Sequence, residues 1–152
     1  MKIYVASSWR NDIQPVVVEE LRKLGHEVYD FKNPEPGNHG FHWSEIDPDW
    51  KNWKHIDFVK ALNHPIANKG FKLDMDALQE CDACVMVLPC NRSSHLEAGY
   101  AIGANKPTVI MLDESCEPEL MYKMTPFICW DLDDVIDCIR FIEGMLREEG
   151  KI

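Results

Sequence analysis

Glu97 is the one carboxylate in a segment of mostly small and apolar residues, NRSSHLEAGYAIGANKP (91–107). Near a helix start its side chain can point back toward that start, because helical side chains lean in this direction. A second carboxylate, Asp74, lies in a stretch (72–81) that reads as a helix leading into an apolar strand. Two carboxylates that flank one bond suit cleavage of a glycosidic bond, since one attacks or stabilises the anomeric carbon and the other handles the leaving group's proton.

Each of these side chains also has a purely structural interpretation. Ser94 and Glu97 have the S-x-x-E spacing of a capping box, in which the glutamate only closes the first helical turn. Asp76 is assigned to a solvated helix face, unlike Asp74. Tyr4 lies in the first apolar run; most strand tyrosines are core residues, but this one could also reach a crevice floor and hydrogen-bond a carboxylate.

Polar loops before two of the predicted helices offer a site for a small anion. Serines at a helix start, with an arginine in each loop, can bind an anion through hydroxyl groups, charge and the helix dipole. Each serine could instead serve only as a helix N-cap. The candidate binding residues are Ser7, Ser8, Trp9, Arg10, Asn91, Arg92, Ser93 and Ser94.

Short apolar runs at 2–6, 26–31, 82–89, 107–112 and 127–130 predict the strands that position these side chains. Segments with helical spacing alternate with them, the first with Asp12 as its candidate N-cap. Almost fully apolar strands indicate a parallel sheet covered on both faces. We therefore expect an α/β fold, a flavodoxin- or Rossmann-like three-layer sandwich with a central parallel sheet of about five strands. Ligands of such sheets bind beyond the carboxyl ends of the strands, where both polar loops lie.

The stretch 32–56 interrupts this alternation and carries Trp43, Trp50 and Trp53. It is too aromatic for a disordered linker, and a long ordered loop is often a lid or a binding loop. The tryptophans could stack on a nucleobase, or they could close a small satellite core.

The composition bounds the class of protein. Its 152 residues suit one domain, so we expect a single domain over 1–152, and the formal net charge of −10 argues against general nucleic-acid binding. No apolar run approaches the roughly 20 residues of a membrane helix, so we expect a cytoplasmic protein without a membrane partner.

Cys81 and Cys84 form a CxxC without a second pair at zinc spacing, and we interpret them as buried thiols. We predict no metal and no cofactor.

Three stretches, KIYVAS, DMDALQECDACVMVLP and HLEAGYAIGANKPTVIML, together resemble the nucleoside 2-deoxyribosyltransferase superfamily, which includes deoxynucleoside-monophosphate N-glycosidases. The resemblance runs along about residues 2–112. It implies that Glu97 is the nucleophile that attacks C1′ of the sugar and expels the base. It also implies that Tyr4 orients this nucleophile and that Asp74, eight residues before Asp82, assists the departing base. In this interpretation, Gly99 and Gly103 let the Glu97 helix pack closely on the sheet.

The resemblance implies a small-molecule nucleoside or nucleotide as the partner, and a homo-oligomer. Transferases acting on free nucleosides often carry an aspartate in the loop before the nucleophile, whereas this loop reads Asn-Arg-Ser-Ser (91–94). That departure favours a 5′-monophosphate, with Arg10, Ser93 and Ser94 near the phosphate. Water as the second acceptor would give a hydrolase and a second base would give a transferase; the sequence does not decide between them.

Rival interpretations remain. Toll/interleukin-receptor-like domains also use a glutamate in a flavodoxin-like sheet and cleave the nicotinamide bond of NAD. A non-catalytic nucleotide-binding or sensing module would keep the crevice without turnover. A simple structural domain fits the tryptophan-rich stretch least well.

Overall fold

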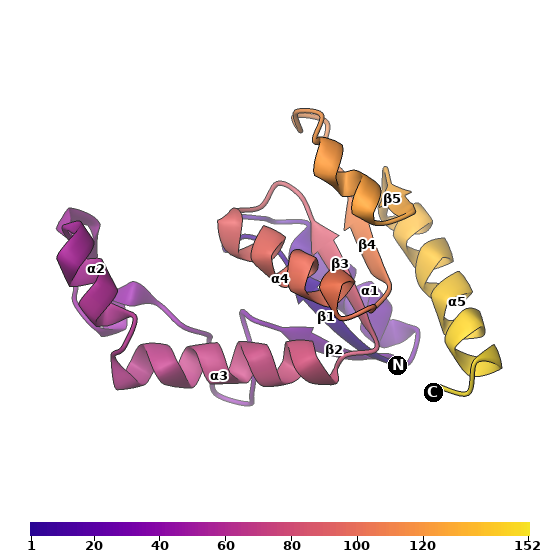
Figure 1. Cartoon of the computed structure of the whole chain (residues 1–152). Helices are drawn as coiled ribbons and strands as arrows, with labels where there is room; N and C mark the ends of the chain where they lie inside the picture. The colour runs from indigo at the N-terminus through magenta and orange to yellow at the C-terminus, as the bar shows by residue number, and fades with distance from the viewer. The chain divides into compact units, whose positions relative to one another are not determined.

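Five parallel strands form one sheet in the order β2-β1-β3-β4-β5 (Figure 1). The strands are β1 (Lys2–Ala6), β2 (Glu27–Asp30), β3 (Ala83–Val87), β4 (Thr108–Met111) and β5 (Phe127–Cys129). The three inner strands β1, β3 and β4 are almost entirely buried, as expected for a parallel sheet shielded on both faces, whereas the edge strands β2 and β5 are buried only in part. The predicted α/β sandwich with a five-stranded parallel sheet is confirmed.

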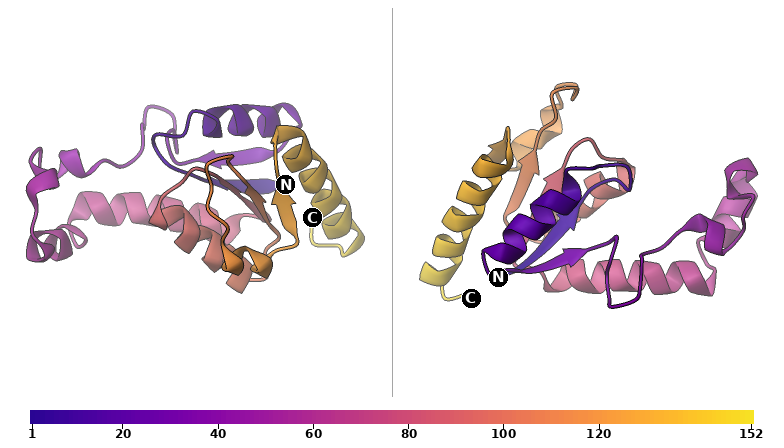
Figure 2. Two further views of the ribbon diagram at one scale, coloured as in Figure 1. Left: turned by 90° about the horizontal axis from the view of Figure 1, so that it is seen from above. Right: turned by 180° about the vertical axis from the view of Figure 1, so that it is seen from behind.

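Helices cover both faces of this sheet (Figure 2). α1 (Gln14–Lys23) and α5 (Leu132–Glu148) lie on one face, and α4 (Arg92–Gly103) lies on the other. Because side chains alternate along a strand, Ile3 and Val5 join the core under α1 and α5, whereas Tyr4 points to the face of α4. None of the helices is both long and apolar enough to span a lipid bilayer.

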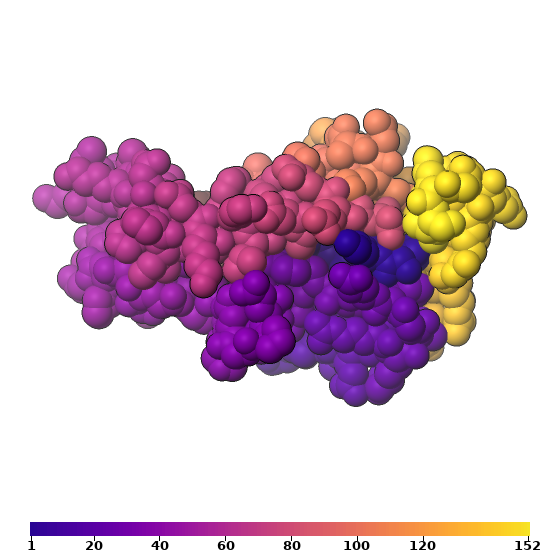
Figure 3. Space-filling model, turned by 90° about the horizontal axis from the view of Figure 1, so that it is seen from below, coloured from indigo at the N-terminus to yellow at the C-terminus, as the bar shows by residue number.

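The structure describes residues 1–152 as two compact units, Met1–Asp30 with Leu78–Ile152, and Phe31–Ala77. The first unit holds the whole sheet. Its N-terminus and its last residues lie at the same end, where the indigo and yellow segments come together (Figure 3). That end is the amino-terminal edge of the parallel sheet, so the carboxyl ends of the strands lie at the opposite edge. A single domain over 1–152 remains a prediction.

The second unit is built around aromatic rings. It contains the short helices η1 (Trp43–Glu45) and η2 (Trp50–Asn52), α2 (His55–Ala61) and most of α3 (Pro65–Glu80). The ring of Trp43 makes edge-on contacts with Phe41, Trp53 and Phe58 at centroid distances of 4.7, 5.6 and 5.7 Å. Two of the three tryptophans of 32–56 therefore close a satellite core.

Gly70 of α3 is required by this satellite core. A Cβ placed on Gly70 would come within 2.9 Å of the Cβ of Phe41, closer than side chains pack. We expect Gly70→Ala to lower the free energy of unfolding by about 1–3 kcal/mol through overpacking, although alanine favours a helix by about 1 kcal/mol over glycine. Gly144→Ala in α5 is the matched control, because a Cβ there meets nothing, and it should be neutral or stabilising in urea unfolding. Equal stabilisation by both substitutions would show that the Phe41 contact imposes no limit.

Candidate active site

The polar loops meet at the carboxyl ends of β1 and β3. These two strands are neighbours in the sheet. The chain leaves β1 through α1 toward β2 on one side, and it leaves β3 through α4 toward β4 on the other side. Open parallel sheets bind their ligands beyond the carboxyl ends of the strands, at the point where the strand order reverses in this way.

Glu97 lies on α4, well inside the helix. The helix begins at Arg92 after Asn91 as N-cap, so Ser94 is a helical residue and not the cap. A capping box needs its serine at the N-cap, and this alternative for Glu97 is therefore wrong. The Glu97 side chain is partly exposed, in contrast to the fully buried Ala98 next to it. A first-turn structural role no longer accounts for this carboxylate.

Small residues bring α4 close to the sheet, but they are not the glycines. Ser94, Ala98 and Ala101 form the buried stripe of the helix. Gly99 and Gly103 are exposed, and a Cβ on either would meet no atom within 4 Å. The prediction that these two glycines permit the close packing is wrong, because they lie off the buried stripe.

Tyr4 forms the floor beneath α4. It is fully buried and pairs in register with Tyr29 of β2 and Cys84 of β3. The rings of Tyr4 and Tyr29 stack at a centroid distance of 5.3 Å. Burial, the nearby Cys81 and the charge of Glu97 together raise the pKa of the Cys84 thiol well above its usual value. Tyr4 is thus the strand neighbour of Cys84, whose pKa also responds to the charge of Glu97.

The serines of the two loops bind protein groups. The Ser7 hydroxyl donates to the carbonyl oxygen of Val87 at 2.8 Å, and the Ser94 hydroxyl donates to the carbonyl oxygen of Ser7 at 2.9 Å. Ser8 Oγ accepts from the backbone N–H of Arg10 at 3.3 Å and from Nδ2 of Asn91 at 3.4 Å. These bonds join the loop after β1 to the start of α4.

Asn11, for which the sequence predicted no role, forms four side-chain hydrogen bonds that join the loop after β1 to the end of β3 and to the start of α1. It is almost fully buried, and its Nδ2 donates to the carbonyl oxygens of Val87 at 3.3 Å and Pro89 at 3.2 Å. Its Oδ1 accepts from the backbone N–H groups of Ile13 and Gln14 at 2.8 and 2.9 Å. The N-cap of α1 is Ile13, which offers no capping side chain, so the predicted cap Asp12 is wrong; the Asn11 amide instead holds the backbone turn that leads into the helix.

The remaining candidate residues of the two loops are exposed to solvent: Trp9, Arg10, Asn91, Arg92 and Ser93.

Asp74 is half-buried on α3, within the unit Phe31–Ala77. Asp76 on the same helix forms an exposed ion pair with Lys72 at 2.5 Å, which confirms its assignment to a solvated face.

A histidine on α4 anchors the connection between β4 and β5. His95 Nδ1 lies 3.0 Å from the carbonyl oxygen of Asn91, which only accepts, so Nδ1 carries a proton. In the neutral ring, Nε2 then accepts from the hydroxyl of Tyr122 at 3.0 Å, and the two rings stack at 6.0 Å. Tyr122 belongs to the short helix η3 (Leu120–Met124). No motif in the sequence links these two residues.

The pKa of the Cys90 thiol depends in part on the charge of the Glu97 carboxylate. Burial raises its pKa to about 11, with a smaller upward contribution from Glu97 and a downward one from Ser94. The thiol is thus protonated at neutral pH, and we expect iodoacetamide to alkylate Cys90 at pH 8 about 100-fold more slowly in the folded protein than in urea. The rate should rise about tenfold per pH unit until the pH reaches the pKa.

Glu97→Gln should speed this alkylation, because removing a negative charge lowers the pKa of a neighbouring thiol. Peptide mass spectrometry of Cys90 against pH measures the effect, and Glu148→Gln at an exposed site on α5 is the matched control. Identical profiles for both variants would contradict the closeness of Glu97 to Cys90.

Comparison with known proteins shows which solved structures this fold is similar to. Among solved structures the chain is similar to a 2-deoxyribosyltransferase from the psychrotolerant bacterium Bacillus psychrosaccharolyticus. The two sequences are 20% identical, the match covers 89% of this chain and 90% of that chain, and the TM-score is 0.60. The chain is also similar to the CMP N-glycosidase BcmB of Clostridium botulinum, with 16% sequence identity over 92% of this chain and 99% of that chain and a TM-score of 0.49. No protein-family model and no curated protein matches the sequence. The first match shows that this chain has the fold of a 2-deoxyribosyltransferase, in agreement with the superfamily that the sequence resembles.

Proposed function

We propose that the protein cleaves or transfers the N-glycosidic bond of a (deoxy)nucleoside or its 5′-monophosphate, as an enzyme of the nucleoside 2-deoxyribosyltransferase superfamily. One observation carries the proposal: Glu97, in the Glu-Ala-Gly-Tyr-Ala segment, lies on the helix that follows β3, at the point where the strand order reverses. The likeness in fold to a 2-deoxyribosyltransferase supports it.

Glu97 is the nucleophile in this proposal. As the bond between C1′ and the base lengthens, positive charge develops on the sugar, and a carboxylate close to C1′ stabilises that charge. The same oxygen then bonds to C1′, which gives a glycosyl ester and divides one difficult step into two. Tyr4, buried on the adjacent strand, orients the carboxylate, and Asp74 supplies the proton that the departing base takes up. Attack on C1′ by water or by a second base completes the cycle.

The charge around the loops favours a phosphorylated substrate. Arg10 and Arg92 supply cationic groups in an acidic protein, and the first backbone N–H groups of α4, like those of any helix start, can donate to an anion. Ser93 is exposed and can donate its hydroxyl, whereas Ser94 already donates to the Ser7 carbonyl and would offer only its backbone N–H. Ser94 therefore holds the loop in place while Ser93 and the arginines face the phosphate.

Arg10→Ala tests this assignment of the phosphate. We expect KM for a nucleoside 5′-monophosphate to rise at least about tenfold, since a charge-assisted hydrogen bond contributes about 1.5–3 kcal/mol. KM for the corresponding free nucleoside should not change. Steady-state base release from the matched pair of substrates gives both values, and equal effects on the two would place Arg10 away from the phosphate.

Base release is the experiment that tests the function itself. The purified protein is incubated with each deoxynucleoside, ribonucleoside and 5′-monophosphate and with NAD, and the products are separated by chromatography. Free base from one class identifies a hydrolase, and base exchange only when a second base is added identifies a transferase. Release of nicotinamide alone would favour the Toll/interleukin-receptor-like alternative. Tight nucleotide binding without any release would contradict catalysis and favour a sensing module.

A further inference from the structure

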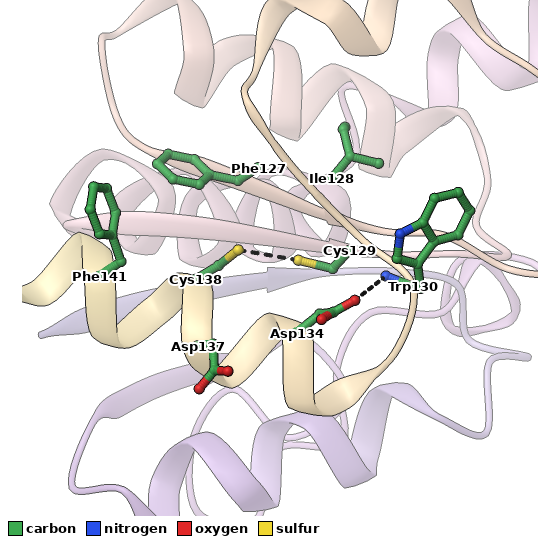
Figure 4. A pocket seen from close by; sticks show the side chains of 8 residues that line it. All are labelled: Phe127, Ile128, Cys129, Trp130, Asp134, Asp137, Cys138 and Phe141. Atoms are coloured by element: carbon green, nitrogen blue, oxygen red, sulfur yellow. Dashed lines mark hydrogen bonds between the residues drawn. The ribbon is translucent and has the colours of Figure 1, made fainter.

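Two cysteines outside the candidate active site have their sulfur atoms in contact. Cys129 ends β5 and Cys138 lies on α5, and their Sγ atoms are 3.4 Å apart (Figure 4). The Cys129 thiol is fully buried and donates its hydrogen to the sulfur of Cys138, which is partly exposed. Both cysteines are free thiols.

The pair opens into a cavity of about 360 Å³ between the last strand and the last helix. Its wall includes the aromatic residues Phe127 and Phe141 and the acidic residues Asp134 and Asp137 (Figure 4). A small polar molecule can therefore reach the sulfur of Cys138 from solvent. The Cys129 sulfur lies directly behind it, in position to attack whatever forms on Cys138.

We propose that Cys129 and Cys138 form a dithiol site that a neutral hydroperoxide oxidises to a disulfide. The Cys138 sulfur attacks one oxygen of hydrogen peroxide, the O–O bond breaks, and Cys138 becomes a sulfenic acid as one water leaves. The Cys129 sulfur then attacks the Cys138 sulfur, the S–O bond breaks, and a second water leaves with the thiol hydrogen. Two thiols and one peroxide thus yield one disulfide and two waters.

The charges around the pair select the oxidant. Burial, the hydrogen bond to Cys138 and the negative charges of Asp134 and Asp131 all raise the pKa of the Cys129 thiol. The same carboxylates repel anionic oxidants such as glutathione disulfide but not uncharged hydrogen peroxide. We therefore expect slow oxidation by peroxide and still slower oxidation by glutathione disulfide.

The chain contains its own comparison pair. Cys81 and Cys84, the CxxC of the sequence, are both buried, and the Cys81 thiol donates to the carbonyl oxygen of Leu78. Burial raises the pKa of each. Both side chains are buried, in contrast to the partly exposed Cys138, so this pair should stay reduced under the same treatment.

Tryptic digestion gives a direct readout, because Lys123 and Arg140 bound one peptide that holds Cys129 and Cys138 and no other cysteine. The full chain is treated with hydrogen peroxide, unfolded in urea with iodoacetamide, and digested. We expect this peptide to carry no alkyl group and to be lighter than its reduced form by two hydrogen atoms. Reduction with dithiothreitol should restore two alkylation sites, and the oxidised protein should melt about 5 °C higher, since a disulfide restrains the unfolded chain.

Cys138→Ser and Cys129→Ser are the control variants. Neither should form the internal link, and each should leave the remaining thiol available to iodoacetamide. The proposal is overturned if Cys138 is recovered as a sulfinic or sulfonic acid while Cys129 is still alkylated. It is equally overturned if the peptide keeps two alkyl groups at a peroxide dose that oxidises the partly exposed Cys116, or if Cys81 and Cys84 link first.

Discussion

Glu97→Ala should reduce base release by roughly a thousandfold or more in kcat, the scale of losses seen when an enzyme's covalent nucleophile is removed. KM should change far less, because the loops after β1 and β3, and not the Glu97 carboxylate, would hold the sugar phosphate. The measurement is kcat and KM on the substrate that the base-release assay identifies. Glu148→Ala, at an exposed site on α5, is the matched control and should be fully active.

Chemical rescue separates a missing nucleophile from a disturbed fold. If Glu97 attacks C1′, then Glu97→Ala leaves a small space in which formate can act in place of the lost carboxylate. We expect added formate to restore part of the base release in Glu97→Ala and to leave Glu97→Gln unaffected, since glutamine still fills the site. Full activity of Glu97→Ala would rule out the proposed nucleophile, and absence of rescue in a folded variant would favour a role in orienting the substrate.

The strands could be predicted from the sequence because buried parallel strands are continuous apolar runs. The run at 2–6 coincides with β1, and the runs at 82–89 and 107–112 contain β3 and β4. The start of α3 at Pro65, where a helix was predicted only from 72, was missed. Gly70 reads as a helix breaker, and only the packing of Phe41 against it, a contact distant in sequence, explains why a glycine is needed there.

In the candidate site, too, some features could be predicted from the local sequence and others depend on the fold. Glu97, Tyr4 and the serines could be named in advance because their types and places along the chain are local information. The orientation of α4 was mistaken, although Ser94, Ala98 and Ala101 already have helical spacing and Gly99 lies off their stripe. The contact between Cys129 and Cys138 could not be predicted from the sequence, because it depends on how β5 and α5 pack in the folded sheet. The only cysteine pair that the sequence suggests is the CxxC at 81–84, and both of its thiols are buried.

Asn11→Asp should lower the free energy of unfolding by about 2–4 kcal/mol, because it leaves a buried carboxylate facing the carbonyl oxygens of Val87 and Pro89. Asn11→Ser, which loses the same two donors without adding a charge, should cost about 1–2 kcal/mol. Urea unfolding of the two variants beside the parent protein gives both values. Base release should fall in both, since these bonds join the loop after β1 to the strand that leads into the Glu97 helix.

The comparison between aspartate and asparagine distinguishes two roles of the same side chain. At the start of α1, Asn11 uses only its Oδ1, and a carboxylate oxygen of aspartate can accept from the same two backbone N–H groups while also matching the helix dipole. If these two bonds were the whole role, Asn11→Asp would be neutral or stabilising and Asn11→Ser would be nearly neutral. If the Nδ2 bonds to Val87 and Pro89 hold the loop after β1 against the end of β3, aspartate must be the worse of the two substitutions. The order of the two variants therefore decides whether Asn11 stabilises the start of its own helix alone or also joins the loop after β1 to the end of β3.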